Sequence, residues 1–268
     1  NLLPEGKAAN YIITGVWSEK ALDEAKKEGE TKVGGNSADK KHNYIPALAD
    51  LDLGSDDAYV HVTSNNTIYG TQWKQFPNTG DVPLIADMSS DISQFGVIYA
   101  GAQKNLGPSG VTVVIIRKDL LERSPKNMPT MLNYNTHASK NSMYNTPPTF
   151  GIYLLGKVLG WVERYGGVKA IEKLNELKAN MIYDAIDQSN GFYIGHAEKA
   201  SRSLMNVTFN LASQELEKTF LAEAKTKGFV GLNGHRSIGG CRASIYNAVP
   251  VESCEALREF MLEFKAKN

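Results

Sequence analysis

The sequence predicts an α/β fold with a large domain at residues 1–168 and a smaller α+β domain at residues 169–268. Through the first half, short apolar segments alternate with helical ones, which is typical of a sheet with helices on both faces. The apolar segments do not alternate cleanly with polar residues, so they suit a large parallel or mixed sheet that is buried on both sides. Near residue 168 two helical stretches meet without a low-complexity linker, and each half is long enough to bury its own core.

The first domain is expected to contain short strands joined by helices and surface segments. The run at residues 113–116 is continuously aliphatic, so we expect its strand to be buried, and it is far too short to span a membrane. Ser18 precedes a helical stretch and is expected to cap it. Residues 31–50, rich in Gly, Lys and Asn, are interpreted as a surface excursion. The expected strands are residues 10–14, 59–63, 83–87, 96–100 and 111–117.

In the second half, prolines and glycines mark the ends of helices. Pro147 and Pro148 precede a helix expected at residues 149–165, and Gly166 and Gly167 end it. Another helix begins near Val168. A strand at 204–210, a helix at 214–227, a strand at 241–247 and a helix at 252–267 follow. The last helix carries one apolar stripe, made of Cys254, Leu257, Phe260, Met261 and Phe264.

Composition argues against several classes of partner. Lys plus Arg and Asp plus Glu both number 29, so the mean charge does not attract nucleic acid or an anionic membrane. Cys241 and Cys254 lack the spacing of a zinc or disulfide framework, so no metal is expected and a reducing cytoplasm fits. The opening residues lack the layout of a signal peptide. Because the sequence starts at Asn1, we expect it to begin partway into a longer chain.

The most informative motif is the segment 99–110, which contains Lys104 directly after an expected strand. Small residues surround this lysine, so its amine can be partly desolvated and its pKa lowered. Such an amine can condense with an aldehyde. The alternative interpretation is a solvated loop lysine.

Asp87 ends the apolar segment 83–87, where burial of a carboxylate is costly without a cationic partner. A protonated pyridine nitrogen would be such a partner, and the pair would keep a pyridine cofactor an effective electron sink. The alternative is a helix cap or a strand-end turn. Together with Lys104, the pattern favours cofactor chemistry.

Three motifs carry a resemblance to a known family: residues 100–105 (AGAQKN), 145–150 (NTPPTF) and 234–247 (GHRSIGGCRASIYN). In this order they resemble the phosphoserine aminotransferases, the bacterial branch in particular, over essentially the whole chain. The resemblance implies a fold-type-I transferase with pyridoxal 5′-phosphate. It also implies transamination between 3-phosphohydroxypyruvate with glutamate and O-phosphoserine with 2-oxoglutarate, in serine biosynthesis. The family also acts on phosphohydroxythreonine in pyridoxine biosynthesis.

The same resemblance implies roles for residues of the first domain. Lys104 resembles the lysine that bonds the cofactor and shuttles the substrate proton. Asp87 resembles the carboxylate on the pyridine nitrogen, and Gln103 resembles a contact to the cofactor phosphate. Trp17 resembles the aromatic that stacks on the ring, and Thr67 the hydroxyl that binds its phenolic oxygen. From the residues alone, Trp17 could equally be a core tryptophan and Thr67 a turn residue.

Further implied roles concern a partner subunit and the substrates. Asn145 and Thr146 resemble residues that reach the cofactor phosphate of the other subunit of a homodimer, and a following proline holds them extended. Arg242 resembles the residue that binds the substrate α-carboxylate, while His235 and Arg236 are assigned to the phosphate or the glutamate side chain. The alternative is an ordinary surface loop.

The sequence also departs from the family. A Gly-Gly-Ala phosphate loop and a Ser-His-Arg motif, which members carry near their start, are missing, and several residues including an Arg-Pro pair are missing between Ile92 and Ser93. We therefore expect that this segment alone does not turn over substrate.

Two other classes of function are alternatives to this assignment. Another fold-type-I enzyme, such as a serine–glyoxylate aminotransferase or a cysteine desulfurase, would share the cofactor. A desulfurase needs a mobile nucleophilic cysteine, whereas Cys241 lies in an expected strand and Cys254 on a helix stripe. In a non-enzymatic binding or structural protein, Lys104 would be inert to borohydride trapping.

Overall fold

The computed structural model describes residues 1–88 and 95–268, and the described chain divides into two compact units. The first unit comprises Asn1–Ala38, Pro46–Ser64 and Gln75–Gly160. The second comprises Asp39–Ile45, Asn65–Lys74 and Trp161–Asn268. The expected join between Ile92 and Ser93 lies outside the described residues.

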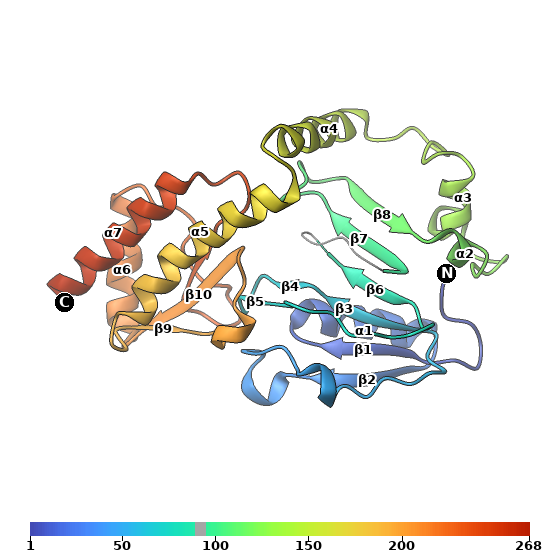
Figure 1. Ribbon diagram of the computed structural model, residues 1–268, viewed down its shortest axis with the longest axis horizontal. Coiled ribbons are helices and arrows are strands. Elements are labelled where there is room, and N and C mark those ends of the chain that lie inside the picture. Colours follow the sequence, from blue (N-terminus) through green and yellow to red (C-terminus); the bar gives the residue numbers. More distant parts are fainter. Residues whose placement is uncertain (89–94) are drawn as a thin grey trace. The chain divides into compact units, whose positions relative to one another are not determined.

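The first unit is built on a six-stranded sheet with the order β2-β1-β3-β6-β7-β8 (Figure 1). All neighbouring pairs are parallel except β7 and β8, so the sheet is mixed. All five predicted strands are present within one residue of their expected bounds. The strands are β1 (Ala9–Ile13), β2 (Thr31–Asn36), β3 (Tyr59–Thr63), β6 (Leu84–Asp87), β7 (Val97–Gly101) and β8 (Thr112–Ile116).

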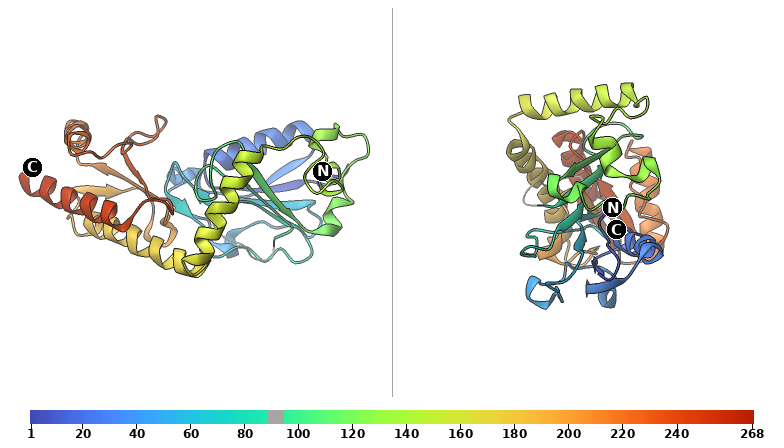
Figure 2. Two further views of the ribbon diagram at one scale, coloured as in Figure 1. Left: turned by 90° about the horizontal axis from the view of Figure 1, so that it is seen from above. Right: turned by 90° about the vertical axis from the view of Figure 1, so that its right-hand side faces the viewer.

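The centre of this sheet is buried, as its apolar sequence predicts. Every residue of β1 and β3 is buried, which requires cover on both faces. Helix α1 (Val16–Glu28) packs against β1, β2 and β3, with Leu22 and Ala25 in the shared core (Figures 1 and 2). The predicted α/β architecture of this unit is confirmed.

Two expectations for the sheet were wrong. Residues 31–50 do not form only a surface excursion, because β2 lies parallel to β1 at the start of this segment. Gly34 and Gly35 of β2 have low strand propensity. A Cβ at Gly34 would overlap the side chain of Asn10, so only glycine fits at that position. The run at 113–116 is not buried: β8 is the last strand of the sheet, and Ile115 is 48% exposed.

The expected cap of α1 was also wrong. The helix begins at Val16 after Gly15, so Ser18 lies inside its first turn. The Ser18 hydroxyl donates to the carbonyl of Gly15 (2.7 Å) and accepts from the amide of Thr14 (2.9 Å). It therefore fixes the chain that enters the helix rather than capping a helix that follows it.

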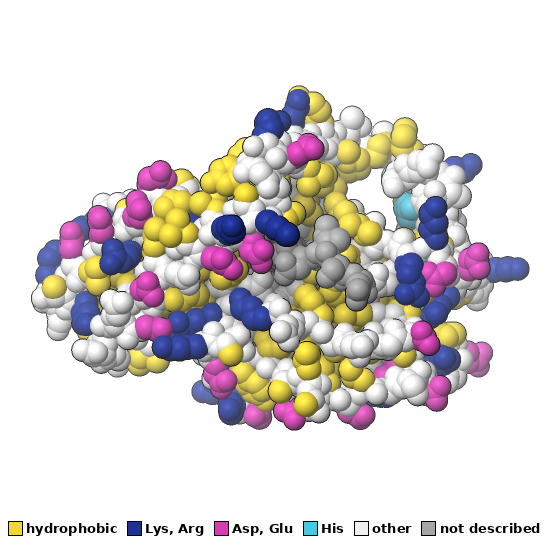
Figure 3. Space-filling view, viewed as in Figure 1, with side chains coloured by type: hydrophobic (Ala, Val, Ile, Leu, Met, Phe, Trp, Pro, Cys, Tyr) yellow, Lys and Arg dark blue, Asp and Glu magenta, His cyan; other side chains and the backbone are white. Residues whose placement is uncertain are grey.

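The rest of the first unit consists of short helices and the long helix α4, which begins directly after the paired prolines as predicted. The described residues of α4 include none that are buried, and Phe150 is 74% exposed. Hydrophobic side chains gather over this helix in Figure 3. These elements are η2 (Leu48–Asp50), α2 (Lys118–Leu121), η3 (Thr130–Leu132), α3 (Tyr134–Ala138) and α4 (Thr149–Arg164), whose last turn belongs to the second unit. The short helix η1 (Ala38–Lys40) begins in the first unit and ends in the second.

The second unit packs three helices on an antiparallel sheet of order β11-β10-β9. Helix α7 lies beside α5 (Figure 2), and the five-residue stripe predicted for the terminal helix is buried. The strand expected at 241–247 ends at Ser244. The elements are β4 (Asn65–Asn66), β5 (Thr71–Gln72), α5 (Val168–Asp187), β9 (Tyr193–Gly195), η4 (Lys199–Ser201), β10 (Asn206–Leu211), α6 (Gln214–Thr226), β11 (Cys241–Ser244) and α7 (Val251–Lys267).

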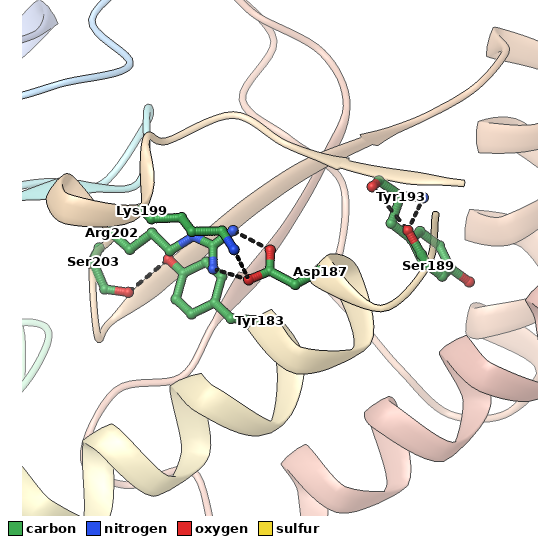
Figure 4. Close-up of polar contacts among 7 residues, drawn as sticks. All are labelled: Tyr183, Asp187, Ser189, Tyr193, Lys199, Arg202 and Ser203. Carbon is green, nitrogen blue, oxygen red and sulfur yellow. Dashed lines mark hydrogen bonds and ion pairs between the residues drawn. The ribbon is translucent and has the colours of Figure 1, made fainter. Parts of the chain in front are cut away.

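An ion-pair cluster ties the end of α5 to the segment that enters β10 (Figure 4). Arg202 donates through two guanidinium nitrogens to Asp187, at 3.0 and 2.6 Å, and lies over the ring of Tyr183. Lys199 makes a further ion pair with Asp187 at 3.1 Å. Hydrogen bonding to Arg202 lowers the pKa of the Asp187 carboxyl to about 2. This cluster fixes the chain that enters β10, the strand that pairs with β11.

The observed units differ from the continuous ranges expected from sequence, because two early segments belong with the second unit. The amide of Ile45 donates to Ser201 (3.0 Å), and the amide of Leu204 donates to the side chain of Gln72 (3.0 Å). The first unit ends at Gly160, before the end of α4. Long-range hydrogen bonds thus connect both early segments to the second unit, although they precede most of it in the sequence.

Candidate active site

The predicted pair of Asp87 and Lys104 lies at one edge of the large sheet. Strands β6 and β7 are parallel neighbours, so their carboxyl ends meet at the same edge. Asp87 is the last residue of β6, and Lys104 lies in the turn that follows Gly101, the last residue of β7. The amide of Ser64 donates to the carbonyl of Asp87 (3.0 Å), which fixes the strand end. The structure therefore brings the two residues together.

The electrostatics of Asp87 suit a cationic partner. Its side chain is partly buried, and this desolvation raises the pKa of the carboxyl. The positive charge of Lys104 acts in the opposite direction but does not cancel the effect of burial. A second cation beside Asp87 would stabilise its charged form.

A tight turn holds Lys104. The carbonyl of Ala102 accepts from the amides of Leu106 (3.2 Å) and Gly107 (2.8 Å), and the amide of Ala102 donates to Val111 (2.9 Å). Lys104 is partly exposed at this turn, whereas the preceding Gln103 is exposed. The turn thus presents an amine from a rigid backbone.

Trp17 is not a core tryptophan, because its side chain is 42% exposed in the first turn of α1. The ammonium of Lys20 lies 5.0 Å from its ring centroid. A flat aromatic face at this position is able to stack on a planar ligand. Its role in the site stays a prediction.

Sequence reasoning missed a buried aromatic network behind Asp87. The Nε2 atom of His61 and the hydroxyl of Tyr99 lie 2.8 Å apart, and the ring of Tyr11 stacks on His61 with 4.7 Å between centroids. Since β6 lies between β3 and β7, the His61–Tyr99 contact must cross over β6, on the face that carries Asp87. The alternation of Tyr59, His61 and Thr63 on β3 was the signal that could have found it.

The burial of His61 predicts acid sensitivity of the fold. Desolvation lowers the pKa of His61 to about 4, whereas the unfolded value is about 6.5. Between these values the unfolded chain binds a proton that the folded chain does not, so stability falls as pH drops through this window. Relative to neutral pH, the free energy of unfolding should be lower by about 2 kcal/mol at about pH 5.

Urea unfolding of wild type and of His61→Gln, near neutral pH and near pH 5, measures this loss of stability. A wild-type loss no larger than that of the variant would contradict the account.

Polar atoms at the same edge are left without protein partners. Among residues 1–88 and 95–268, the buried hydroxyls of Thr63 and Ser64 make no hydrogen bond. Thr63 pairs with Asp87 in the sheet register. Buried polar atoms are normally paired, so these hydroxyls are consistent with a polar ligand at this edge.

In the second unit the structure brings Thr67 and Arg242 together. Thr67 is 7% exposed and lies between β4 and β5, and its backbone carbonyl accepts from Nη1 of Arg242 at 3.1 Å. His235 is partly buried and its Nδ1 lies 2.7 Å from the hydroxyl of Ser237, while Arg236 is exposed. The amide of Gly234 donates to the carbonyl of Gly240 (2.7 Å), which closes this loop.

The remaining sequence-predicted residues are exposed. The side chains of Asn145 and Thr146 both face solvent, and the side-chain amide of Asn145 donates to the carbonyl of Thr146 at 3.3 Å.

The two cysteines, Cys241 and Cys254, are buried, and desolvation raises the thiol pKa of both, that of Cys241 to about 12. Neither thiol therefore has the properties of a mobile nucleophile.

In the described part of the chain, no cluster of three or more His, Cys, Asp or Glu side chains is arranged to hold a metal ion. The helices described there include none that is both long and apolar enough to cross a membrane.

Comparison with known proteins extends these observations. The family model for class-V aminotransferases matches residues 1–257. The phosphoserine aminotransferase of Lysinibacillus sphaericus (strain C3-41) is 66% identical, over 100% of this chain and 76% of the relative. A structure of phosphoserine aminotransferase from Bacillus circulans subsp. alkalophilus matches with a TM-score of 0.97 and 57% identity, over 100% of this chain and 76% of that one. Pyridoxal-phosphate-bound phosphoserine aminotransferase from Trichomonas vaginalis matches with a TM-score of 0.89 and 38% identity, covering 98% and 77%.

Proposed function

Since the chain belongs to the class-V aminotransferases, we propose that Lys104 and Asp87 carry the reaction of a phosphoserine aminotransferase. The protein is a transaminase that interconverts 3-phosphohydroxypyruvate and glutamate with O-phosphoserine and 2-oxoglutarate, in serine biosynthesis, and its cofactor is pyridoxal 5′-phosphate. By extension we propose phosphohydroxythreonine as a second substrate, in pyridoxine biosynthesis. The observation that supports the assignment most is the pairing of an acid and an amine at the ends of adjacent parallel strands.

The residues at this edge fit the cofactor. A partly buried carboxyl with a raised pKa suits a protonated pyridine nitrogen, and the unpaired hydroxyls of Thr63 and Ser64 are able to bind polar groups. When bound, pyridoxal phosphate supplies an electron sink that lowers the energy of negative charge at the substrate Cα. Asp87 would hold the proton on the pyridine nitrogen, and Trp17 would stack on the ring. Gln103 would bind the phosphate and Thr67 the phenolic oxygen.

The chain's own groups then perform the acid–base and binding steps. The Lys104 amine would hold the cofactor in the resting enzyme and, once a substrate is bound, would take the proton that leaves the substrate Cα. Its attachment to a rigid turn keeps the amine close to that proton. Arg242 binds the α-carboxylate through two parallel hydrogen bonds, while His235 and Arg236 bind the substrate phosphate or the glutamate side chain.

We also propose that the enzyme is a cytoplasmic homodimer. Asn145 and Thr146 of one subunit would reach the cofactor phosphate of the other, and the exposure of both side chains supports this role. Two free buried cysteines are consistent with a reducing compartment.

A substrate panel on the intact protein tests the proposed function. With glutamate as donor, kcat/KM for 3-phosphohydroxypyruvate should exceed that for glyoxylate by at least about 100-fold, because glyoxylate lacks the phosphate and leaves its binding groups unpaired. An equal or higher value for glyoxylate would favour a serine–glyoxylate type of enzyme. Release of sulfide from cysteine at a comparable rate would favour a desulfurase.

A further inference from the structure

The three-stranded sheet of the second unit has one apolar and one polar face. Along β10, Val207, Phe209 and Leu211 belong to the hydrophobic core of the unit. The alternating residues Asn206 and Thr208 therefore lie on the other face. Both are nonetheless buried, at 0% and 4% exposure. Some other part of the unit must cover them.

The neighbouring strand places Arg242 on this polar face. In the antiparallel register Thr208 pairs with Arg242, and Asn206 pairs with Ser244. Directly paired side chains lie on the same face of a sheet. The proposed carboxylate-binding residue therefore stands beside Thr208.

The cover is the turn between β4 and β5. The hydroxyl of Thr208 donates to the carbonyl of Tyr69 (2.9 Å), and the side-chain amide of Asn65 donates to Oδ1 of Asn206 (3.1 Å). The carbonyl of Gly70 accepts from the amide of Ser203 (2.8 Å). Three separate hydrogen bonds thus hold a short turn onto β10 and the residues before it.

The approach of this turn to β10 is too close for any side chain at residue 70. Gly70 has a φ of +71°, which disfavours other residues. A Cβ at this position would lie 2.5 Å from the Thr208 hydroxyl and 2.7 Å from the backbone oxygen of Asn206. Glycine at residue 70 is therefore a packing requirement of the contact with Thr208.

Asn206 is itself locked in place. Its Nδ2 atom donates to the hydroxyls of Ser244 and Tyr246, both at 3.1 Å, while its oxygen accepts from Asn65. A fully buried amide with three side-chain partners has one favourable orientation. The polar face thus offers a fixed platform for the turn.

We propose that Thr208 and Asn206 are positioning residues for the substrate α-carboxylate. They fix the turn that contains Thr67, whose carbonyl accepts from Nη1 of Arg242 and so orients the guanidinium. Its Nε is buried without a hydrogen-bond partner among the described residues, so Arg242 still has donors to offer. Binding a carboxylate through a side chain that is already oriented avoids the entropy cost of ordering it. This inference rests on the proposed role of Arg242.

The test uses Thr208→Val, which removes the hydroxyl at nearly constant volume, and Thr208→Ser, which keeps it. In the intact enzyme, Thr208→Val should raise KM for glutamate and for 3-phosphohydroxypyruvate by the same factor of about 5, with kcat within about twofold of wild type. The two factors should agree because the α-carboxylate is common to both substrates. Thr208→Ser, which keeps the hydroxyl, should have both KM values close to those of wild type.

A matched control and a binding measurement separate positioning from a loss of stability. Thr219→Val removes a hydroxyl that donates to the Glu215 carbonyl on the exposed side of α6, and should leave both KM values unchanged. Binding of glutarate, a dicarboxylate that cannot be transaminated, should weaken about 5-fold in Thr208→Val when measured by calorimetry. Gly70→Ala should raise KM further, by about 10-fold or more, because it displaces the turn.

Two outcomes distinguish this inference from the proposed function. If Arg242→Ala raises KM strongly but Thr208→Val has wild-type KM and glutarate affinity, the positioning role is wrong and the role of Arg242 stands. If Arg242→Ala itself leaves KM and glutarate binding unchanged, both the carboxylate role and the positioning role are overturned.

Discussion

Replacing Lys104 with alanine should reduce transamination by at least about 10³-fold, because the enzyme loses both its covalent amine and its general base. The tight turn is held by backbone hydrogen bonds of Ala102, so removal of the side chain leaves the turn intact. We therefore expect the variant to fold, with unfolding transitions close to those of wild type.

The matched control for this variant is Lys126→Ala, which removes an exposed lysine from the same unit. The measurement is kcat for transamination between glutamate and 3-phosphohydroxypyruvate, and circular dichroism verifies that each variant is folded. A Lys104→Ala enzyme that keeps more than about a tenth of wild-type kcat would exclude Lys104 from both roles.

Asp87→Asn should lower kcat on the order of 10³-fold, while cofactor binding is partly retained. Asparagine has nearly the same shape but no negative charge, so it cannot stabilise a proton on the pyridine nitrogen. The effect should appear in the proton-transfer step, which single-turnover mixing with glutamate isolates.

Asp81→Asn provides the comparison, since Asp81 is exposed and lies before the same strand. It should behave as wild type in both turnover and cofactor content. Unchanged single-turnover rates in Asp87→Asn would remove Asp87 from its assigned role, whatever the cofactor content of the variant.

The parts of the fold that follow local rules were predictable from the sequence. Runs of apolar residues identified five strands of the large sheet, and glycine and proline pairs identified the bounds of α4. Strand β2 was missed because its glycines have low strand propensity and are selected by contact with β1. The exposure of β8 depends on its place at the end of the sheet order, which a single segment does not reveal.

The candidate site was predictable only where chemistry coincides with strand ends. Asp87 and Lys104 follow apolar strands, and parallel neighbours bring their ends together. The contact between Thr67 and Arg242 joins residues 175 positions apart, so local sequence holds no sign of it.

Lys178 is a second example of a residue that local sequence does not explain. It occupies a fully buried position on α5 and donates to the carbonyls of Ile245, Tyr246 and Val249. Its position lies on the buried face of α5, with Asn175 and Ile182, although a lysine is rarely fully buried without partners. The burial is explained by the segment that follows β11, whose three carbonyls accept the hydrogen bonds of the ammonium group.

The most direct test of the central claim is borohydride reduction of the intact protein with bound cofactor, followed by peptide mapping. If the amine at the end of β7 bonds the cofactor, the added mass will lie on the peptide that contains Lys104, and Lys104→Ala will yield no labelled peptide. Label on a different lysine, or none in a protein that transaminates, would contradict the account.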